Sequence, residues 1–253
     1  MIRYFLKLAY RGTAYHGWQV QDNAHTVQAE LNQKISILLG EDINVVGCGR
    51  TDTGVHAREF YAHFDNAFPI PFKPDDFVFK LNRFLPNDIA IYDVRKVPGD
   101  LHARFSAVSR TYRYYISQIK DPFLRDLSIE YTGVLNLEAM QEAASYLKNY
   151  TDFTSFSKLH TQTATNNCKI KEAFWVKEDS QLIFTITADR FLRNMVRAIV
   201  GTLLEIGKGK IPASVMKQII ESRDRSKAGF SVPAQGLFLE KIVYSQDPLI
   251  YKV

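Results

Sequence analysis

Short segments of alternating apolar residues take turns with amphipathic helical stretches along the whole chain. A period of two indicates strands, whereas apolar residues three and four positions apart indicate helices that bury one stripe. Strands are predicted on both sides of a loop at residues 47–57 and over residues 3–10, 88–97, 109–117, 170–177, 182–189 and 237–243. This succession predicts an α+β protein with mixed or antiparallel sheets that carry helices on one face.

Five helices are predicted, and the helices expected over residues 26–39, 136–147 and 211–221 show amphipathic patterns. Thr26 is a suitable N-cap for the first helix, which is expected to reach Leu39 and to end at Gly40. The other four helices are predicted over residues 74–85, 136–147, 191–206 and 211–221.

The chain has 253 residues, which suits one large domain or two smaller ones. Each half contains a strand, a long helix and then two strands, and the break falls near residues 100–110. We therefore predict an N-terminal half over residues 1–105 and a C-terminal half over residues 106–253, with a cleft between them. No apolar run is long enough for a membrane helix, and residues 1–7 look like a strand rather than a signal peptide, so a cytoplasmic protein is expected.

The loop at residues 47–57, GCGRTDTGVHA, contains the most distinctive group of polar residues. Gly49 and Gly54 permit a sharp bend and close approach of a ligand to the backbone. Between them lie the carboxylate of Asp52 and the guanidinium of Arg50, so the loop is able to supply a nucleophile or a general base. The local sequence alone is equally compatible with an ordinary surface turn.

Several kinds of chemistry are not expected from the sequence. Cys48 and Cys168 match no zinc or disulfide spacing, and the histidines show no metal-binding arrangement, so no metal site is predicted. Phosphate-binding glycine loops and a Ser-His-Asp elbow are absent. A conventional glycosidase needs a second carboxylate, and the nearby Glu59 and Asp65 lie on what looks like an ordinary strand and its end.

Basic and aromatic residues occur together in two segments, residues 104–115 and 190–197. The net charge of +5 is a weak indication of a polyanionic partner, and this clustering strengthens it. Arginines neutralise phosphates and aromatic rings stack on unpaired bases, which is the combination that looped RNA requires. Chemistry on a base extruded from an RNA stem fits a single carboxylate with arginines and a stacking tyrosine.

The sequence resembles the TruA family of tRNA pseudouridine synthases. The resemblance covers nearly the whole chain and rests on six ordered segments: YRGTAYHGWQ (10–19), GRTDTGVH (49–56), FSA with RTYRY (105–114), DFTSF (152–156), RNMVRAIVG (193–201) and GLFL (236–239). One departure is Thr53, which stands where the family usually has alanine.

The resemblance implies a pseudouridine synthase fold with two similar halves and a basic cleft. It also implies isomerisation of uridine to pseudouridine at positions 38, 39 and 40 of the tRNA anticodon stem-loop, by a homodimer that uses no cofactor. Asp52 matches the catalytic carboxylate and Arg197 the arginine that pairs with it. Tyr112 matches the tyrosine that stacks on the uracil; Arg50 is assigned to base extrusion and Leu237 to an apolar wall for the base.

Other interpretations stay open. Asp52 either attacks ribose C1′ or deprotonates C2′. Tyr112 is also compatible with an ordinary sheet position, and Arg197 with a helix cap or a phosphate contact. For the whole chain the rival hypotheses are a non-catalytic RNA-binding protein and a glycosidase that releases free uracil.

Overall fold

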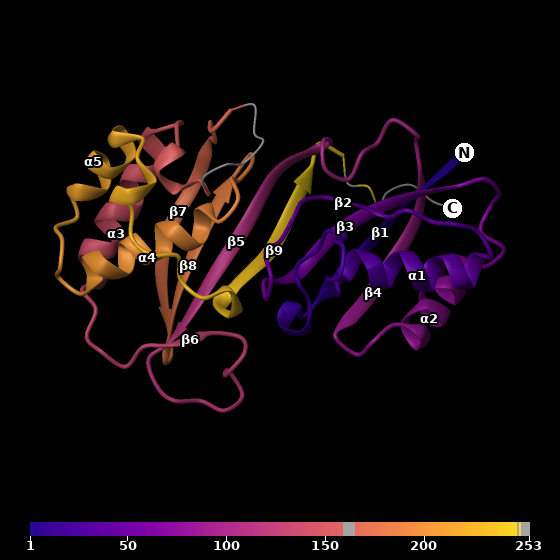
Figure 1. Cartoon of the computed structure of the whole chain (residues 1–253), viewed down its shortest axis with the longest axis horizontal. Coiled ribbons are helices and arrows are strands. Elements are labelled where there is room, and N and C mark those ends of the chain that lie inside the picture. Colours follow the sequence, from indigo (N-terminus) through magenta and orange to yellow (C-terminus); the bar gives the residue numbers. More distant parts are fainter. Residues whose placement is uncertain (159–164, 247, 249–253) are drawn as a thin grey trace. The chain divides into compact units, whose positions relative to one another are not determined.

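The computed structural model describes residues 1–158, 165–246 and 248. Within these residues the chain forms five α-helices and nine strands with mixed pairing, which makes it an α+β protein (Figure 1). It divides into two compact units: the first comprises Met1–Val108 and the described residues from Leu239 onward, and the second comprises Ser109–Phe238. The predicted boundary after residue 105 lies just before this division, but the last strand groups largely with the first unit. The assignment of residues 1–105 and 106–253 as two separate domains stays a prediction.

The first unit is built around β1 (Ile2–Tyr10), which pairs antiparallel with β3 (His56–Asn66) on one side and with β4 (Ile89–Val97) on the other. β9 (Leu237–Tyr244) follows β3 in the strand order. The two-residue β2 (Val46–Gly47) also pairs with β3. The sequence predicted a strand before the loop from the alternating residues Ile43 and Val45, but neither residue belongs to β2. Instead, side chains of α1 (Val27–Leu39) bind the backbone of Val45: Asn32 accepts from its N–H at 2.9 Å and Gln28 donates to its carbonyl at 2.6 Å.

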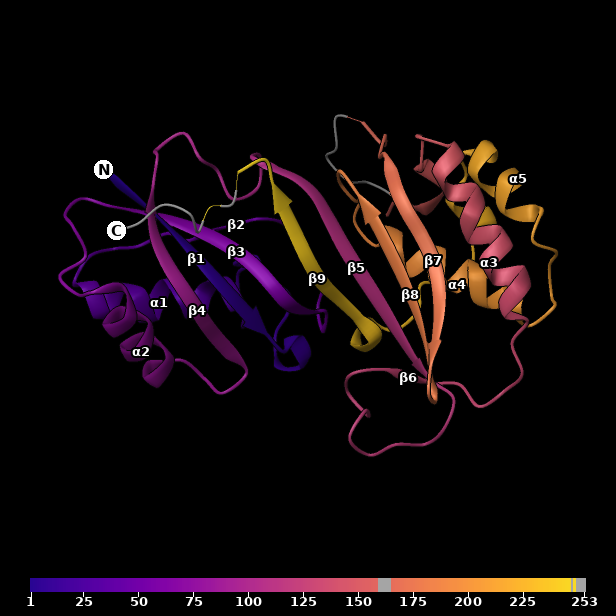
Figure 2. The same cartoon turned by 180° about the vertical axis from the view of Figure 1, so that it is seen from behind.

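Helices α1 and α2 (Pro74–Phe84) belong to the first unit (Figures 1 and 2). The predicted ends of α1 are confirmed, because the Thr26 hydroxyl accepts from the Ala29 N–H at 3.3 Å and Gly40 adopts a left-handed φ of 72°. Leu31 and Ile35 of α1 are fully buried. These residues belong to the stripe that the sequence predicted for α1, and α2 likewise buries one face, with Phe77 and Leu81 fully buried.

In the second unit the strand order is β5 (Ala107–Ser117), β8 (Gln181–Ala188) and β7 (Ile170–Glu178), all antiparallel. The short β6 (Ile129–Glu130) adds a parallel pair to β5. The unit also contains helices α3 (Leu137–Tyr146), α4 (Met195–Gly207) and α5 (Val215–Ser222), and α3 contacts α4, α5 and β7.

Two predicted helix starts are wrong. α4 begins at Met195 rather than at residue 191, because Asn194 has a left-handed φ of 67° that a helix does not accommodate. α5 begins at Val215 rather than at residue 211, because Pro212 lies in a turn whose carbonyl accepts from the Val215 N–H at 3.1 Å.

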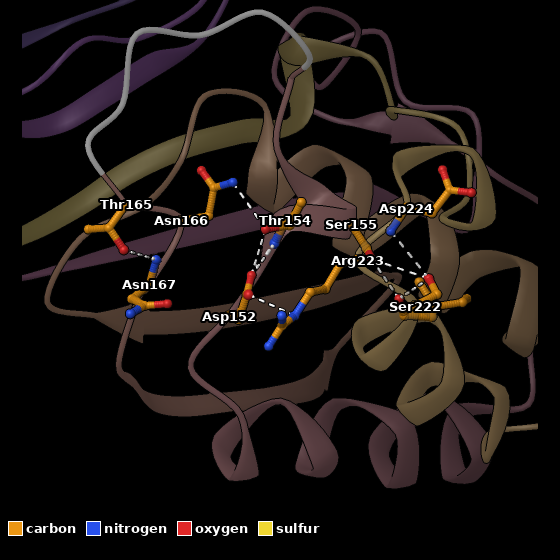
Figure 3. Close-up of polar contacts among 10 residues, drawn as sticks. Asp152, Thr154, Ser155, Thr165, Asn166, Asn167, Ser222, Arg223 and Asp224 are labelled. Carbon is orange, nitrogen blue, oxygen red and sulfur yellow. Dashed lines mark hydrogen bonds and ion pairs between the residues drawn. The ribbon is translucent and has the colours of Figure 1, made fainter.

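The segment at residues 152–156 forms a polar anchor for the end of α5 (Figure 3). Asp152 accepts from the Thr154 N–H at 3.0 Å and from its hydroxyl at 2.6 Å, and these bonds lower the pKa of the Asp152 carboxyl. Asp152 also pairs with Arg223 at 3.0 Å, and the buried Ser155 hydroxyl donates to the Ile219 carbonyl at 2.6 Å. This motif therefore has a structural explanation within its own unit.

Candidate active site

The loop that carries Asp52 connects β2 to β3. Asp52 is partly buried, Arg50 is exposed, and Thr51 between them is buried. The Val55 N–H donates to the Asp52 carbonyl at 3.1 Å, which closes a tight turn after the carboxylate. Gly54 in this turn has a φ of 79°, a conformation that favours glycine. The loop thus places the Asp52 side chain on a defined backbone turn rather than on a loose surface segment.

Hydrogen bonds connect the segment from Tyr10 to Trp18 with this loop. The Tyr10 and Thr51 hydroxyls are 2.8 Å apart in a buried hydrogen bond. Backbone N–H groups donate from Gly12 to His56 Nδ1 at 3.0 Å, from Trp18 to the Thr51 carbonyl at 3.3 Å, and from Gly54 to the Tyr15 carbonyl at 3.3 Å. Thr51 and His56 therefore shape the loop that presents Asp52.

Two glycines allow the same segment to approach the loop backbone closely. A Cβ atom on Gly12 would lie 2.0 Å from the Val55 carbonyl oxygen, and one on Gly17 would lie 2.4 Å from that of Thr51. Gly17 also has a φ of 88°. The sequence analysis identified the segment at residues 10–19 but not its structural role. Its two glycines, Gly12 and Gly17, were the feature from which a close approach of two backbones was predictable.

The aromatic residues Tyr15 and Trp18 of the segment are packing residues. Trp18 is 2% exposed and stacks on Phe60 with ring centroids 4.1 Å apart. Tyr15 is equally buried and donates from its hydroxyl to Asp88 at 2.6 Å. Cys48 is buried too, and its sulfur accepts from the Tyr61 N–H at 3.4 Å, which agrees with a small packed residue rather than a nucleophile.

The second unit carries the other predicted site residues. Tyr112 on β5 is partly buried, and its ring meets Phe191 edge-on at a centroid distance of 5.2 Å. Arg197 lies in the first turn of α4, where its Nε donates to the Val232 carbonyl at 2.7 Å. This position rules out a role as a cap at the C-terminal end of the helix. Leu237 starts β9 and is 6% exposed.

The predicted residues fall into two sets. Asp52 and Arg50 share one loop of the first unit. In the second unit, Arg197 is bonded to a segment that leads within a few residues to Leu237, while Tyr112 lies on β5.

Within the described part of the chain, no group of three or more histidine, cysteine or acidic residues is arranged to hold a metal ion. His160 lies outside the described residues. Burial raises the pKa of the Cys168 thiol to about 12, so this thiol stays protonated. No helix among the described residues has the length and apolar content for a membrane span.

Comparison with known proteins identifies the family. A family model described as tRNA pseudouridine synthase matches residues 143–245. The chain is 51% identical to tRNA pseudouridine synthase A of Porphyromonas gingivalis over 249 residues, which cover 98% of this chain and 99% of the relative. It is 52% identical to the protein of that name from Bacteroides thetaiotaomicron (98% and 92% covered) and 44% identical to that from Clostridium acetobutylicum (94% and 98%). The chain therefore belongs to the TruA family of tRNA pseudouridine synthases.

Proposed function

We propose that this isomerase converts uridine to pseudouridine at positions 38, 39 and 40 in the anticodon stem-loop of tRNA. Near-complete coverage of relatives named tRNA pseudouridine synthase A supports the activity. The observation that carries the assignment of the site is the buried hydrogen bond between Tyr10 and Thr51 beside Asp52. It fixes the turn that carries the Asp52 carboxylate, and an ordinary surface loop does not need to be fixed in this way. A basic cleft between similar halves, a homodimeric enzyme and a cytoplasmic location are parts of the same proposal.

The reaction breaks the bond between ribose C1′ and uracil N1 and forms one between C1′ and C5. The proton on C5 is lost and N1 gains one, so the product has the mass of the substrate and no oxidant or reductant is needed. Asp52 is the catalytic carboxylate, either as the nucleophile at C1′ or as the base at C2′.

The other residues have supporting roles in this proposal. Tyr112 stacks on the extruded uracil, and Leu237 supplies an apolar wall for it. Arg197 pairs with the catalytic carboxylate, and the bond from its Nε to the Val232 carbonyl supports this role because it fixes the orientation of the guanidinium. Arg50, which is exposed beside Asp52, assists extrusion of the base.

Release of tritium from tRNA labelled at uridine C5 tests the proposal, with Asp52→Asn as the variant. We expect this variant to lose tritium release while it still binds tRNA, and the matched change Asp22→Asn in an exposed turn to keep both. Transcripts with cytidine at positions 38, 39 and 40 should release no tritium. Full activity of Asp52→Asn would refute the assignment. Binding without release by the wild-type protein would favour an RNA-binding protein, and release of free uracil would favour a glycosidase.

A further inference from the structure

One segment of the second unit connects two of the proposed site residues. Residues 228–236 run beside α4 and end immediately before Leu237 at the start of β9. The position of this segment therefore affects both the guanidinium of Arg197 and the side chain of Leu237.

Arg197 is bonded to this segment through both its backbone and its side chain. Its Nε donates to the Val232 carbonyl at 2.7 Å, and its own carbonyl accepts from the Val232 N–H at 3.2 Å. Because Nε is used in this way, the plane of the guanidinium is tied to the peptide between Val232 and Pro233. A shift of that peptide changes where the terminal nitrogens of Arg197 point.

The beginning of the segment is held by close contact with α4. A Cβ atom on Gly201 would lie 1.7 Å from the Phe230 carbonyl oxygen, and one on Gly229 would lie 2.8 Å from the Thr202 nitrogen. The Thr202 hydroxyl accepts from the Gly229 N–H at 2.9 Å. These contacts account for the glycine that ends the motif at residues 193–201.

The end of the segment is held by Tyr114. This side chain is fully buried, and its hydroxyl donates to the Pro233 carbonyl at 2.8 Å. Its ring also packs on Gly236, where a Cβ atom would lie 2.9 Å from the tyrosine Cζ. Burial raises the pKa of the Tyr114 phenol although the nearby charge of Arg197 lowers it, so the hydroxyl remains a donor.

We infer that Tyr114 is a positioning residue for Arg197: its hydroxyl holds the Pro233 carbonyl, and Pro233 is the residue that follows the Val232 carbonyl to which the guanidinium is bonded. Tyr114 thereby holds in place the peptide between Val232 and Pro233, which orients the guanidinium. Tyr114 does not contact the substrate in this arrangement. It differs in this from Tyr112, two residues earlier on β5, which is only partly buried. The consequence for turnover rests on the proposed function, whereas the orientation of Arg197 does not.

The test uses Tyr114→Phe in the full-length protein, because this change keeps the ring against Gly236 and removes only the donor. Ser155→Ala is the matched control, since it also removes a buried hydroxyl that donates to a carbonyl in the second unit, at Ile219. The first measurement is hydrogen exchange of the Arg197 Nε–H by NMR, with the signal identified by its loss in Arg197→Lys. The second is kcat and KM for tRNA from tritium release.

We expect about tenfold faster exchange of the Arg197 Nε–H in Tyr114→Phe and a kcat that is lower by about tenfold or more, because a small misorientation of a catalytic group has effects of this size. KM should stay within about twofold of the wild-type value, since ground-state binding is not changed. Ser155→Ala should change neither the exchange rate nor kcat. Wild-type exchange or wild-type kcat in Tyr114→Phe would overturn the inference, whereas wild-type kcat in Arg197→Lys would overturn the proposed role of Arg197 instead.

Discussion

His63 should make the first unit less stable as the pH falls from 7 to 4.5. Its side chain on β3 is buried, stacks on Phe5 with ring centroids 5.8 Å apart, and accepts from the Ala103 N–H at Nδ1 at 3.2 Å. Burial is the main cause that lowers the pKa of His63 to about 4; the charges of Arg3 and His102 act in the same direction, and Asp65 opposes them. Protonation of Nδ1 would also remove the bond from Ala103.

The direction of this pH effect on stability depends on whether the folded or the unfolded state binds the His63 proton more readily. In the unfolded chain a histidine has a pKa of about 6.5, so between pH 6.5 and 4 the unfolded state takes up a proton that the folded state refuses. Stability is therefore complete above pH 6.5 and is lost as the pH falls towards 4. At about 1.4 kcal/mol for each tenfold difference in proton affinity, the full effect is about 3 kcal/mol, of which roughly 2–3 kcal/mol is reached at pH 4.5.

The perturbation is His63→Asn, whose amide oxygen replaces Nδ1 as an acceptor and does not titrate. Urea unfolding is measured at several pH values in a Trp175→Phe background, so that fluorescence comes from Trp18, which is buried in the same unit as His63. The parent should lose roughly 2–3 kcal/mol more than His63→Asn between pH 7 and 4.5. The exposed change His16→Asn should leave the pH dependence of the parent unaltered. Parallel stability curves for the parent and His63→Asn would refute this reasoning.

Two further predictions concern packing and the Asp52 loop. Gly201→Ala should destabilise the second unit by at least about 1–3 kcal/mol, because the added methyl meets the Phe230 carbonyl, whereas Gly99→Ala adds its methyl to open space and should be near neutral in the same denaturation assay. Thr51→Val should leave the buried Tyr10 hydroxyl without its Thr51 partner, cost about 1–3 kcal/mol and lower kcat for tritium release, while Thr53→Ala at an exposed position should retain near wild-type turnover. Equal kcat values for Thr51→Val and Thr53→Ala would contradict the role assigned to the Tyr10–Thr51 bond.

Most secondary structure was predictable because its signals are local. The cap at Thr26, the glycine at Gly40 and the apolar stripe of α1 lie within a few turns of one another, and the structure confirms all three. The failures have local causes as well. The left-handed Asn194 delays the start of α4, and side chains of α1 take the backbone partners of Val45, so the strand before the loop is reduced to two residues.

The site was predictable in composition but not in construction. The sequence identified a glycine-bracketed loop with Asp52 and Arg50, and the resemblance added roles for Tyr112, Arg197 and Leu237, which remain proposals. It did not show that Tyr10 bonds to Thr51 or that Gly12 and Gly17 lie against the loop backbone. Those contacts join residues some 40 positions apart, and no short-range pattern encodes them.

By itself, the sequence determined the order of strands and helices, the chemical groups available and the family. Tertiary structure decided the surroundings of two similar tyrosines: Tyr112 and Tyr114 lie on the same face of β5, yet Tyr114 is fully buried and bonded to Pro233, 119 residues away, whereas Tyr112 is only partly buried. The physical reason is that periodicity reflects the geometry of a single element, whereas burial and hydrogen-bond partners depend on which distant segments the fold brings together.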